Sequence, residues 1–218
     1  IGLKQWQKPL LTLGAAVPLM AVTAGVDTMI VPFFGHVTFG LLYPLVLIPI
    51  GVVGASNMVN MLAGFNGMET GMAMIYIGML GLYGHVHDRT IVVLIAAFLF
   101  FALLAFFLFN KYPAKILPGD SLTYLLGGSL AVIAILGNIE KAALIVSIPF
   151  FVEFCLKVRT WFQADSFGSY KDGKIISKYR QIYSLPHLFT RTGKFTERQV
   201  TLFMMGITLF FSLLIWVV

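Results

Sequence analysis

A short polar segment interrupts the apolar sequence between residues 57 and 71, and its side chains could bind a charged ligand. It reads Asn-Met-Val-Asn-Met-Leu-Ala-Gly-Phe-Asn-Gly-Met-Glu-Thr-Gly. Asn57 and Asn60 are three residues apart, so on a helix they share a face. Amides in a membrane region cost free energy unless they are hydrogen-bonded, so we expect them to face the bundle or a polar cavity. The alternative is a helix-packing seam, because Gly67 and Gly71 fit a small-xxx-small pattern.

A second polar segment, Asn110–Ser121, contains two prolines that predict an extended loop, and Gly119-Asp120 then opens the next apolar run. An aspartate at this position often caps a helix by accepting a backbone N–H bond. The other reading is a metal ligand. One carboxylate and one amide oxygen, with phosphate oxygens and water completing the shell, suit Mg²⁺.

Positive charge marks two further candidates. Lys8 precedes Pro9 at the mouth of the first apolar run. It is either an anchor that extends to the membrane surface or a point charge that meets a phosphate. Residues 159–198 mix basic and aromatic side chains, which could bind anionic lipid headgroups, nucleic acid or a nucleotide sugar. The alternative is an ordinary positively charged cytoplasmic loop that is attracted to acidic lipid.

The elements that carry these residues must lie in a membrane. Of 218 residues, 59% are hydrophobic and only 11% are charged, whereas a soluble domain carries about 25% charged residues. This composition excludes a soluble globule, a disordered chain and a collagen-like chain. Seven apolar runs are candidate transmembrane helices: Leu10–Val26, Leu41–Leu62, Gly71–Tyr83, Ile91–Phe109, Leu122–Gly137, Ala142–Val158 and Val200–Val218. The run Gly71–Tyr83 is short for a full crossing.

The positive charges predict the orientation. Seven crossings that begin on the cytoplasmic side leave only Arg89 and Lys141, of 15 Lys and Arg residues, on the outer side. The net charge of +6 is therefore first a topology signal, and we expect no nucleic-acid partner. This arrangement places both polar segments and the insertion 159–198 on the cytoplasmic face. We expect one membrane domain, residues 1–218, with that single insertion.

Three blocks together resemble the polyprenyl-phosphate N-acetylhexosamine-1-phosphate transferases, a superfamily of the glycosyltransferase 4 type. Lys4–Leu11 resembles the stretch that follows the family's Asp-Asp pair, Asn57–Gly71 resembles its Asn-rich block, and Asn110–Asp120 resembles its Tyr-Pro…Gly-Asp loop. Residues 63–67 read Ala-Gly-Phe-Asn-Gly where bacterial members usually read Asp-Gly-x-Asp-Gly. This favours the eukaryotic and archaeal branch that makes dolichyl-diphosphate N-acetylglucosamine.

The resemblance implies roles for individual residues. Asp120 and Asn60 would be catalytic and would bind Mg²⁺, with Mn²⁺ as an alternative, while Lys8 would contact phosphate. Gly64 and Asn66 would line a uracil pocket. The remaining substrate-binding candidates are Asn57, Glu69 and Leu117, together with Arg180, His187 and Arg191, which stand in for an Arg-His-Arg motif that the insertion lacks.

The resemblance also implies an all-α polytopic bundle in which about seven of the family's ten or so spans are present. The Asp-Asp pair and the first three spans would lie before Ile1. The implied reaction transfers N-acetylglucosamine-1-phosphate from UDP-N-acetylglucosamine to dolichyl phosphate, the first step of lipid-linked oligosaccharide synthesis for protein N-glycosylation. The location would be an archaeal cell membrane, or the endoplasmic reticulum in a eukaryote.

Three alternatives stay open. A bacterial-type enzyme would use undecaprenyl phosphate or another hexosamine. A transporter would use the polar helix breaks to line a solute path. A noncatalytic scaffold would neither catalyse a reaction nor transport a solute. The sequence does not determine the oligomeric state, so a homodimer also stays open.

Overall fold

The computed structural model describes residues 7–31 and 35–217. Residues 1–6 lie outside the described residues, and with them Lys4 and the start of the first block. Helices dominate the described chain. They are α1 (Gln7–Ala21), the π-helix η1 (Tyr43–Leu47) with α2 (Ile48–Met61), α3 (Met68–Val86), α4 (Thr90–Asn110), α5 (Gly119–Gly137), α6 (Glu140–Val146), α7 (Ile148–Val158), α8 (His187–Thr190) and α9 (Glu197–Leu214).

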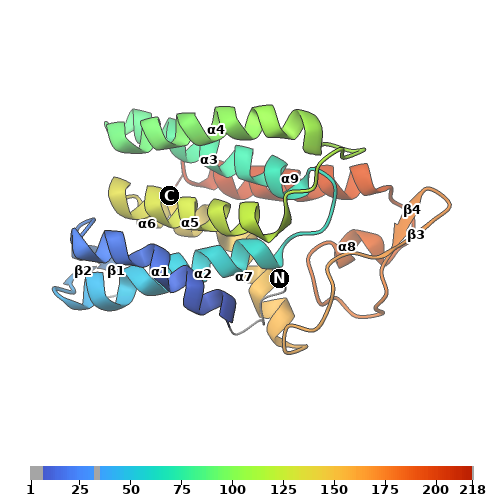
Figure 1. Ribbon diagram of the computed structural model, residues 1–218, viewed down its shortest axis with the longest axis horizontal. Coiled ribbons are helices and arrows are strands. Elements are labelled where there is room, and N and C mark those ends of the chain that lie inside the picture. The colour runs from blue at the N-terminus through green and yellow to red at the C-terminus, as the bar shows by residue number, and fades with distance from the viewer. Residues whose placement is uncertain (1–6, 32–34, 218) are drawn as a thin grey trace.

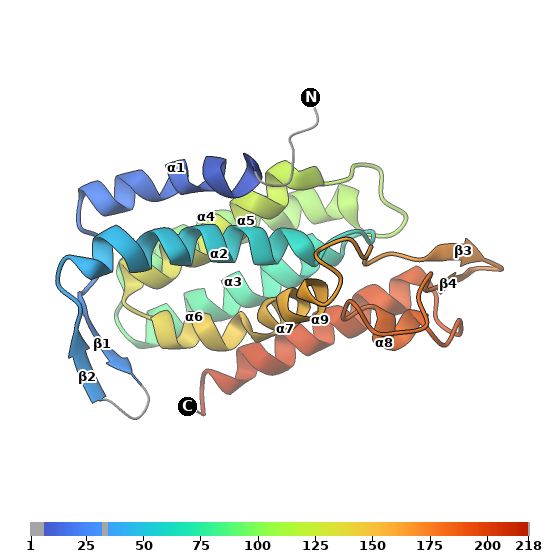
Figure 2. The ribbon, with the colours of Figure 1, turned by 90° about the horizontal axis from the view of Figure 1, so that it is seen from below.

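The long helices lie side by side in a bundle, so the predicted helical membrane fold is confirmed (Figures 1 and 2). Two small antiparallel hairpins were not predicted. β1 (Thr28–Val31) pairs with β2 (Gly35–Thr38) at one end of the bundle, and β3 (Ser169–Lys171) pairs with β4 (Lys174–Ile176) at the other. The second hairpin had a readable signal, because Asp172-Gly173 is a two-residue turn in which both residues have positive φ.

Four helical segments of the described chain are long and apolar enough to cross a membrane: Tyr43–Met61, Thr90–Asn110, Gly119–Gly137 and Glu197–Leu214. The run that was expected to be short, residues 71–83, belongs to the 19-residue helix α3, which spans about 28 Å at 1.5 Å per residue. The run 142–158 is divided at Ser147 into α6 and α7, where Pro149 lacks the N–H that would continue the hydrogen-bond ladder. The total of seven crossings stays a prediction.

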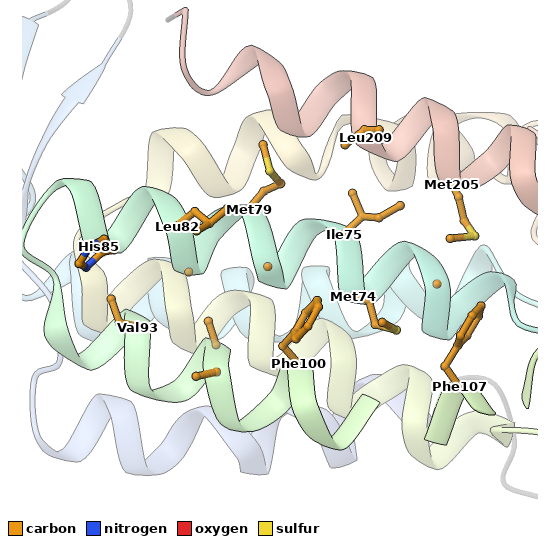
Figure 3. A pocket seen from close by; sticks show the side chains of 15 residues that line it. Met74, Ile75, Met79, Leu82, His85, Val93, Phe100, Phe107, Met205 and Leu209 are labelled. Carbon is orange, nitrogen blue, oxygen red and sulfur yellow. The ribbon is translucent and has the colours of Figure 1, made fainter. Parts of the chain in front are cut away.

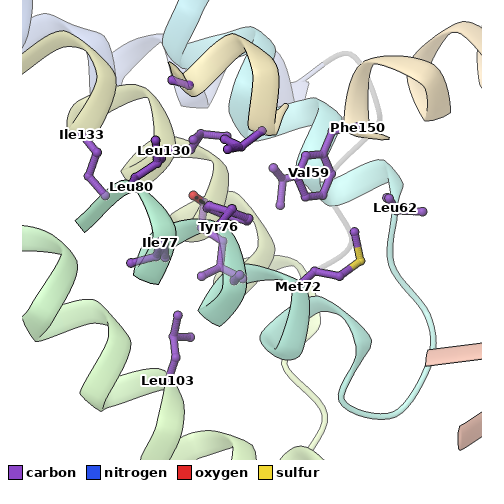
Figure 4. Close-up of a cluster of buried hydrophobic side chains, with 14 of the residues drawn as sticks. Val59, Leu62, Met72, Tyr76, Ile77, Leu80, Leu103, Leu130, Ile133 and Phe150 are labelled. Carbon is purple, nitrogen blue, oxygen red and sulfur yellow. Dashed lines mark hydrogen bonds between the residues drawn. The ribbon is translucent and has the colours of Figure 1, made fainter. Parts of the chain in front are cut away.

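The main core lies where α3 packs against α4, α5 and α9. Tyr76 is at its centre, fully buried, and its hydroxyl donates to the Leu126 carbonyl at 3.1 Å. Its ring meets Phe150 edge to face, with 5.7 Å between centroids. The side chains around Tyr76 are apolar (Figure 4): Val59, Leu62, Met72, Ile77, Leu80, Leu103, Leu130 and Ile133.

Helices α2 and α5 approach each other closely because Gly127 has no side chain. A Cβ atom at Gly127 would lie 2.3 Å from the carbonyl oxygen of Ala55. That distance is too short for any side chain, so only glycine fits at this position. This contact brings the last turn of α2 beside the first turns of α5. It therefore determines how the two polar segments predicted from the sequence face each other.

Candidate active site at the loop end of the bundle

A pocket of about 320 Å³ lies where α2 ends, α3 begins and α5 begins. The starts of α3 and α5 lie at the end of the bundle that also carries the insertion 159–198 (Figure 1), so the pocket forms at that end. Five residues singled out in the sequence line it together: Asn60, Gly64, Glu69, Leu117 and Asp120. The tertiary structure thus joins the two polar segments, which are some fifty residues apart in the chain, into one site.

Asp120 does not cap its helix. Helix α5 begins at Gly119 with Pro118 before it, and no side chain caps this end. The Asp120 carboxylate instead accepts a hydrogen bond from the Lys8 ammonium at 2.7 Å, forming an ion pair between α5 and α1. The Asp120 side chain is 60% exposed, whereas Lys8 is only 15% exposed. The carboxylate is therefore fixed on one side and open to a ligand on the other.

Asn60, in the last turn of α2, is held at both ends of its amide by α5. Its Oδ1 accepts from the Thr123 hydroxyl at 2.5 Å, and its Nδ2 donates to the Tyr124 hydroxyl at 3.2 Å. Thr123 and Tyr124 follow Asp120 by three and four positions, so all three lie near one face of α5. Sequence reasoning missed this pair, although the helical period from Asp120 could have indicated it.

The donor set of this pocket fits a hard divalent cation. Asp120 supplies a carboxylate with a free side, and Asn60 supplies an amide oxygen that has a second lone pair. Mg²⁺ prefers oxygen ligands and usually takes few from the protein, with phosphate and water completing its shell. Within residues 7–31 and 35–217, no group of three or more His, Cys, Asp or Glu gathers as a closed metal cage, so a partly open site is the kind this chain offers.

Glu69, which contributes to the lining of this pocket, has one carboxylate oxygen without a partner. The residue is buried, and its Oε1 accepts from the Gly64 backbone N–H at 2.5 Å. Its Oε2 has no hydrogen-bond partner in the described structure. Gly64 has a φ of +122°, a conformation that favours glycine. A buried acceptor without a partner is costly, and this oxygen is itself buried, so a ligand role for Glu69 stays a prediction.

Asn66 and Asn57 lie outside this pocket lining. The Asn66 backbone N–H donates to Glu197 at 2.7 Å, and its carbonyl accepts from Thr201 at 3.3 Å, so its turn is tied to α9. The Asn57 amide donates to Thr12 of α1 at 3.3 Å and to the Val53 carbonyl. In this structure Asn57 serves the α1–α2 contact, and the substrate roles of both residues stay predictions.

The loop before α5 is shaped by a buried amide. Asn110 is fully buried, accepts from Thr70 at 2.7 Å and donates to the Ile116 carbonyl at 2.9 Å. These bonds hold the loop against the first turn of α3. Gly67, with φ +75°, allows this approach, because a Cβ there would lie 3.1 Å from the Lys111 Cα. The loop then places Leu117, which is exposed, at the pocket edge.

The three candidates in the insertion do not line the pocket. His187 is fully buried, Tyr183 donates its N–H to Nδ1 at 3.2 Å, and Nε2 lies 3.0 Å from the Asp165 carbonyl. Burial lowers the pKa of the His187 imidazole, while the Asp165 carbonyl opposes that shift. Arg180 and Arg191 are exposed on the insertion. Their sugar-binding roles stay predictions, and His187 is already engaged in holding the insertion together.

Glu153 is a buried carboxylate that anchors the insertion. It is fully buried in α7 and accepts hydrogen bonds from the Ser184 hydroxyl and the Leu185 N–H, both at 2.7 Å. Lys157 lies 3.7 Å away in the same helix and donates to the Ala164 carbonyl. The sequence showed a carboxylate inside an apolar run but gave no indication of these partners.

Two apolar cavities flank the polar pocket. One, of about 680 Å³, begins at Lys8 and runs between α1, α2, α4 and α5, where Leu11, Val52 and Phe98 contribute to its lining. The other, of about 580 Å³, lies between α3, α4 and α9 (Figure 3) and is lined mainly by apolar side chains such as Met74, Phe100 and Leu209. Only the first has a cation at its end, beside Asp120.

Comparisons with known proteins show which family and which relatives this chain is similar to. The model of the family described as glycosyl transferase family 4 matches residues 1–138. A protein of Saccharolobus solfataricus with the provisional name UDP-N-acetylglucosamine–dolichyl-phosphate N-acetylglucosaminephosphotransferase is 36% identical over 215 residues, covering 98% of this chain and 67% of that protein. A protein of Sulfolobus acidocaldarius with the same name is 32% identical over 219 residues, covering 98% and 66%.

A bacterial relative matches less of the chain. The phospho-N-acetylmuramoyl-pentapeptide-transferase of Lacticaseibacillus paracasei is 37% identical over 155 residues, which is 70% of this chain and 48% of that protein. The chain spans about two thirds of the length of the first two relatives.

Proposed function

Because the chain belongs to glycosyl transferase family 4, we propose that it transfers N-acetylglucosamine-1-phosphate from UDP-N-acetylglucosamine to dolichyl or another polyprenyl phosphate. The single observation that carries this proposal is the polar pocket, whose lining joins Asn60, Glu69 and Asp120 beside Lys8. Two relatives that match nearly the whole chain bear the name of this activity. The resemblance expected from the sequence is confirmed at the level of the family.

In the proposed reaction, an oxygen of the lipid phosphate attacks the β-phosphorus of UDP-N-acetylglucosamine. The bond between that phosphorus and the bridging oxygen breaks, and UMP leaves with the electron pair. The products are dolichyl-diphosphate N-acetylglucosamine and UMP. Phosphoryl transfer of this kind needs in-line positioning and neutralisation of charge more than covalent chemistry from the protein.

Asp120 and Asn60 would hold the divalent cation. A bound Mg²⁺ would neutralise the pyrophosphate and make UMP a better leaving group. Thr123 and Tyr124 fix the Asn60 amide so that its oxygen keeps one orientation. Helix α5 begins at Gly119, so its positive dipole end would also face the anionic part of the substrate.

Lys8 lies at the junction of the polar pocket and the apolar cavity of about 680 Å³. A lipid phosphate could rest its headgroup at this ammonium and its apolar chain in the cavity. The donor would then bind on the Asp120 side of the same ion pair. This arrangement supports a lipid acceptor because the two substrates would meet where Lys8 contacts Asp120.

The location follows from the same proposal. The starts of α3 and α5, which line the pocket, lie at the bundle end that carries the positively charged insertion (Figure 1), and by the charge rule this end would face the cytoplasm. The reaction would then begin lipid-linked oligosaccharide synthesis for protein N-glycosylation. A transporter is less well supported, because the polar pocket-lining residues gather at one end of the bundle and not at mid-membrane.

The decisive experiment uses the full-length protein in membranes with several nucleotide sugars and lipid phosphates. Mg²⁺-dependent release of UMP, together with a product that has the mass of polyprenyl-diphosphate N-acetylglucosamine, is the expected result. A preference for another hexosamine or for undecaprenyl phosphate would instead indicate the bacterial-type alternative. Solute flux across vesicles without UMP release would contradict the enzymatic proposal.

A further inference from the structure

The insertion 159–198 contributes one aromatic side chain to the lining of the polar pocket. Phe167 lies between α7 and β3, and the residue is 44% exposed. It packs against the backbone of Gly64, since a Cβ there would lie 3.1 Å from the Phe167 Cδ1. The pocket therefore has a wall of aromatic carbon that none of the predicted site residues supplies.

The residue before Phe167 fixes its position. Ser166 is buried, and its hydroxyl lies 3.2 Å from the Met61 carbonyl and 3.3 Å from Oε1 of Glu153. Met61 directly follows Asn60 at the end of α2. One hydroxyl thus connects the insertion both to the turn that carries Asn60 and to the buried carboxylate of α7.

Glu153 holds a second stretch of the insertion at the same time. The Ser184 hydroxyl and the Leu185 N–H both donate to its carboxylate at 2.7 Å. Because Glu153 is fully buried, these bonds are not exchanged with water and are costly to break. The insertion is therefore held against the pocket from both of its halves.

A cation packs on the Phe167 ring. The Lys178 ammonium lies 4.7 Å from the ring centroid, and Asp165 fixes that ammonium at 2.8 Å. Such a cation–π contact adds to the packing against Gly64. The ring is thus restrained from two directions while part of it remains open to the pocket.

We propose that Phe167 stacks on the uracil base of the nucleotide donor and that Glu153 acts through Ser166 as its positioning residue. The inference rests on the proposed function. A base is the part of UDP-N-acetylglucosamine with flat apolar faces, and aromatic side chains bind such faces by stacking. Leu117 and Pro118 in the same lining supply further apolar surface.

The test measures steady-state kinetics of the full-length enzyme with Phe167→Leu and Phe167→Trp. Loss of stacking in Phe167→Leu should raise the KM for UDP-N-acetylglucosamine about tenfold and leave kcat close to the wild-type value. Inhibition by UMP should weaken by the same factor, and Phe167→Trp should restore both. Tyr170→Ala is the matched control, because Tyr170 is an exposed aromatic of the same insertion that lies outside the pocket lining.

The positioning role is tested by Glu153→Gln, with Ser166→Ala as the milder variant if the first fails to fold. Either should raise the KM for the donor in the same direction without changing the KM for the lipid phosphate. In the double variant with Phe167→Leu, the loss of donor-binding free energy should be smaller than the sum of the losses in the two single variants, because both substitutions act on one contact. Full additivity would overturn the link between Glu153 and Phe167.

Two outcomes would overturn the stacking contact itself. One is an unchanged donor KM in Phe167→Leu, and the other is a raised KM with unchanged inhibition by UMP, which would move the contact to the sugar. Direct binding of UMP to wild type and to Phe167→Leu needs no turnover. It therefore tests the base contact even if the wild-type protein releases no UMP and the proposed function fails.

Discussion

Lys8 and Asp120 are 112 positions apart in the chain, yet the ammonium of one lies 2.7 Å from the carboxylate of the other. Lys8 is mostly shielded from solvent, and Asp120 is mostly open to it. The pair therefore presents a fixed carboxylate towards the polar pocket and a cation towards the neighbouring apolar cavity. This polarity suits the proposed reaction between a charged nucleotide and a lipid phosphate.

We expect Asp120→Asn to lower kcat by about 10²–10³, because it removes a principal electrostatic contact of the transition state. Steady-state release of UMP by the full-length enzyme measures the effect. Asp27→Asn is the control, since Asp27 lies next to β1 at the other end of the bundle. Near-normal turnover of Asp120→Asn would remove this residue from the metal site.

We expect Asn60→Ala to lose about 10²-fold in kcat, while Tyr124→Phe should lose no more than about tenfold. The first change removes the oxygen that would face the cation. The second removes only the acceptor that orients the amide nitrogen. A titration of Mg²⁺ should show a weaker apparent affinity for both variants. Equal losses in the two would mean that orientation of the amide, and not its oxygen, carries the effect.

We expect Gly127→Ala to destabilise the protein by about 3 kcal/mol or more, the upper end of the usual cost of overpacking. The reason is that the added methyl group would overlap backbone atoms of α2. Gly128→Ala is the matched control: the next residue of the same helix would place its Cβ 3.5 Å from the Ser56 hydroxyl, an ordinary contact. Thermal unfolding in detergent compares the two. Equal melting temperatures would show that α2 and α5 can move apart without cost.

We expect the insertion to loosen as the pH falls. Burial lowers the pKa of His187 in the folded protein, so the unfolded segment binds a proton more readily than the folded one. The stability contributed by neutral His187 is present above the unfolded pKa of about 6.5 and is lost as the pH drops through the lower folded value.

Hydrogen exchange of residues 177–191 across this pH range measures the loosening. His187→Gln should remove its pH dependence, because an amide does not titrate there. His36→Gln, at the exposed strand β2, should leave it unchanged. Exchange that rises with falling pH in His187→Gln as strongly as in wild type would assign the effect to another group.

The sequence by itself determined the class of the protein and the places where chemistry could lie. Long apolar runs must form helices in lipid because the backbone has no other hydrogen-bond partners there. Against that background, Asn60, Glu69 and Asp120 stand out as polar residues with a cost that only pairing or function can offset. These inferences are local, so they need no knowledge of packing.

Only the tertiary structure decided which of these residues meet. The Gly127 contact sets the distance between α2 and α5, and with it the bonds from Thr123 and Tyr124 to Asn60. Such contacts depend on how helices pack, and the pattern of one helix does not encode the face of another.

The insertion 159–198 shows most clearly the difference between what the sequence predicts and what only the tertiary structure decides. Its charge and aromatic content left several kinds of ligand open, and the family resemblance suggested Arg180, His187 and Arg191 as the substrate-binding candidates. The structure buries His187 and places Phe167 in the pocket lining instead. An irregular segment has no period from which side-chain direction can be read, so its orientation follows from the anchor that Glu153 provides in α7.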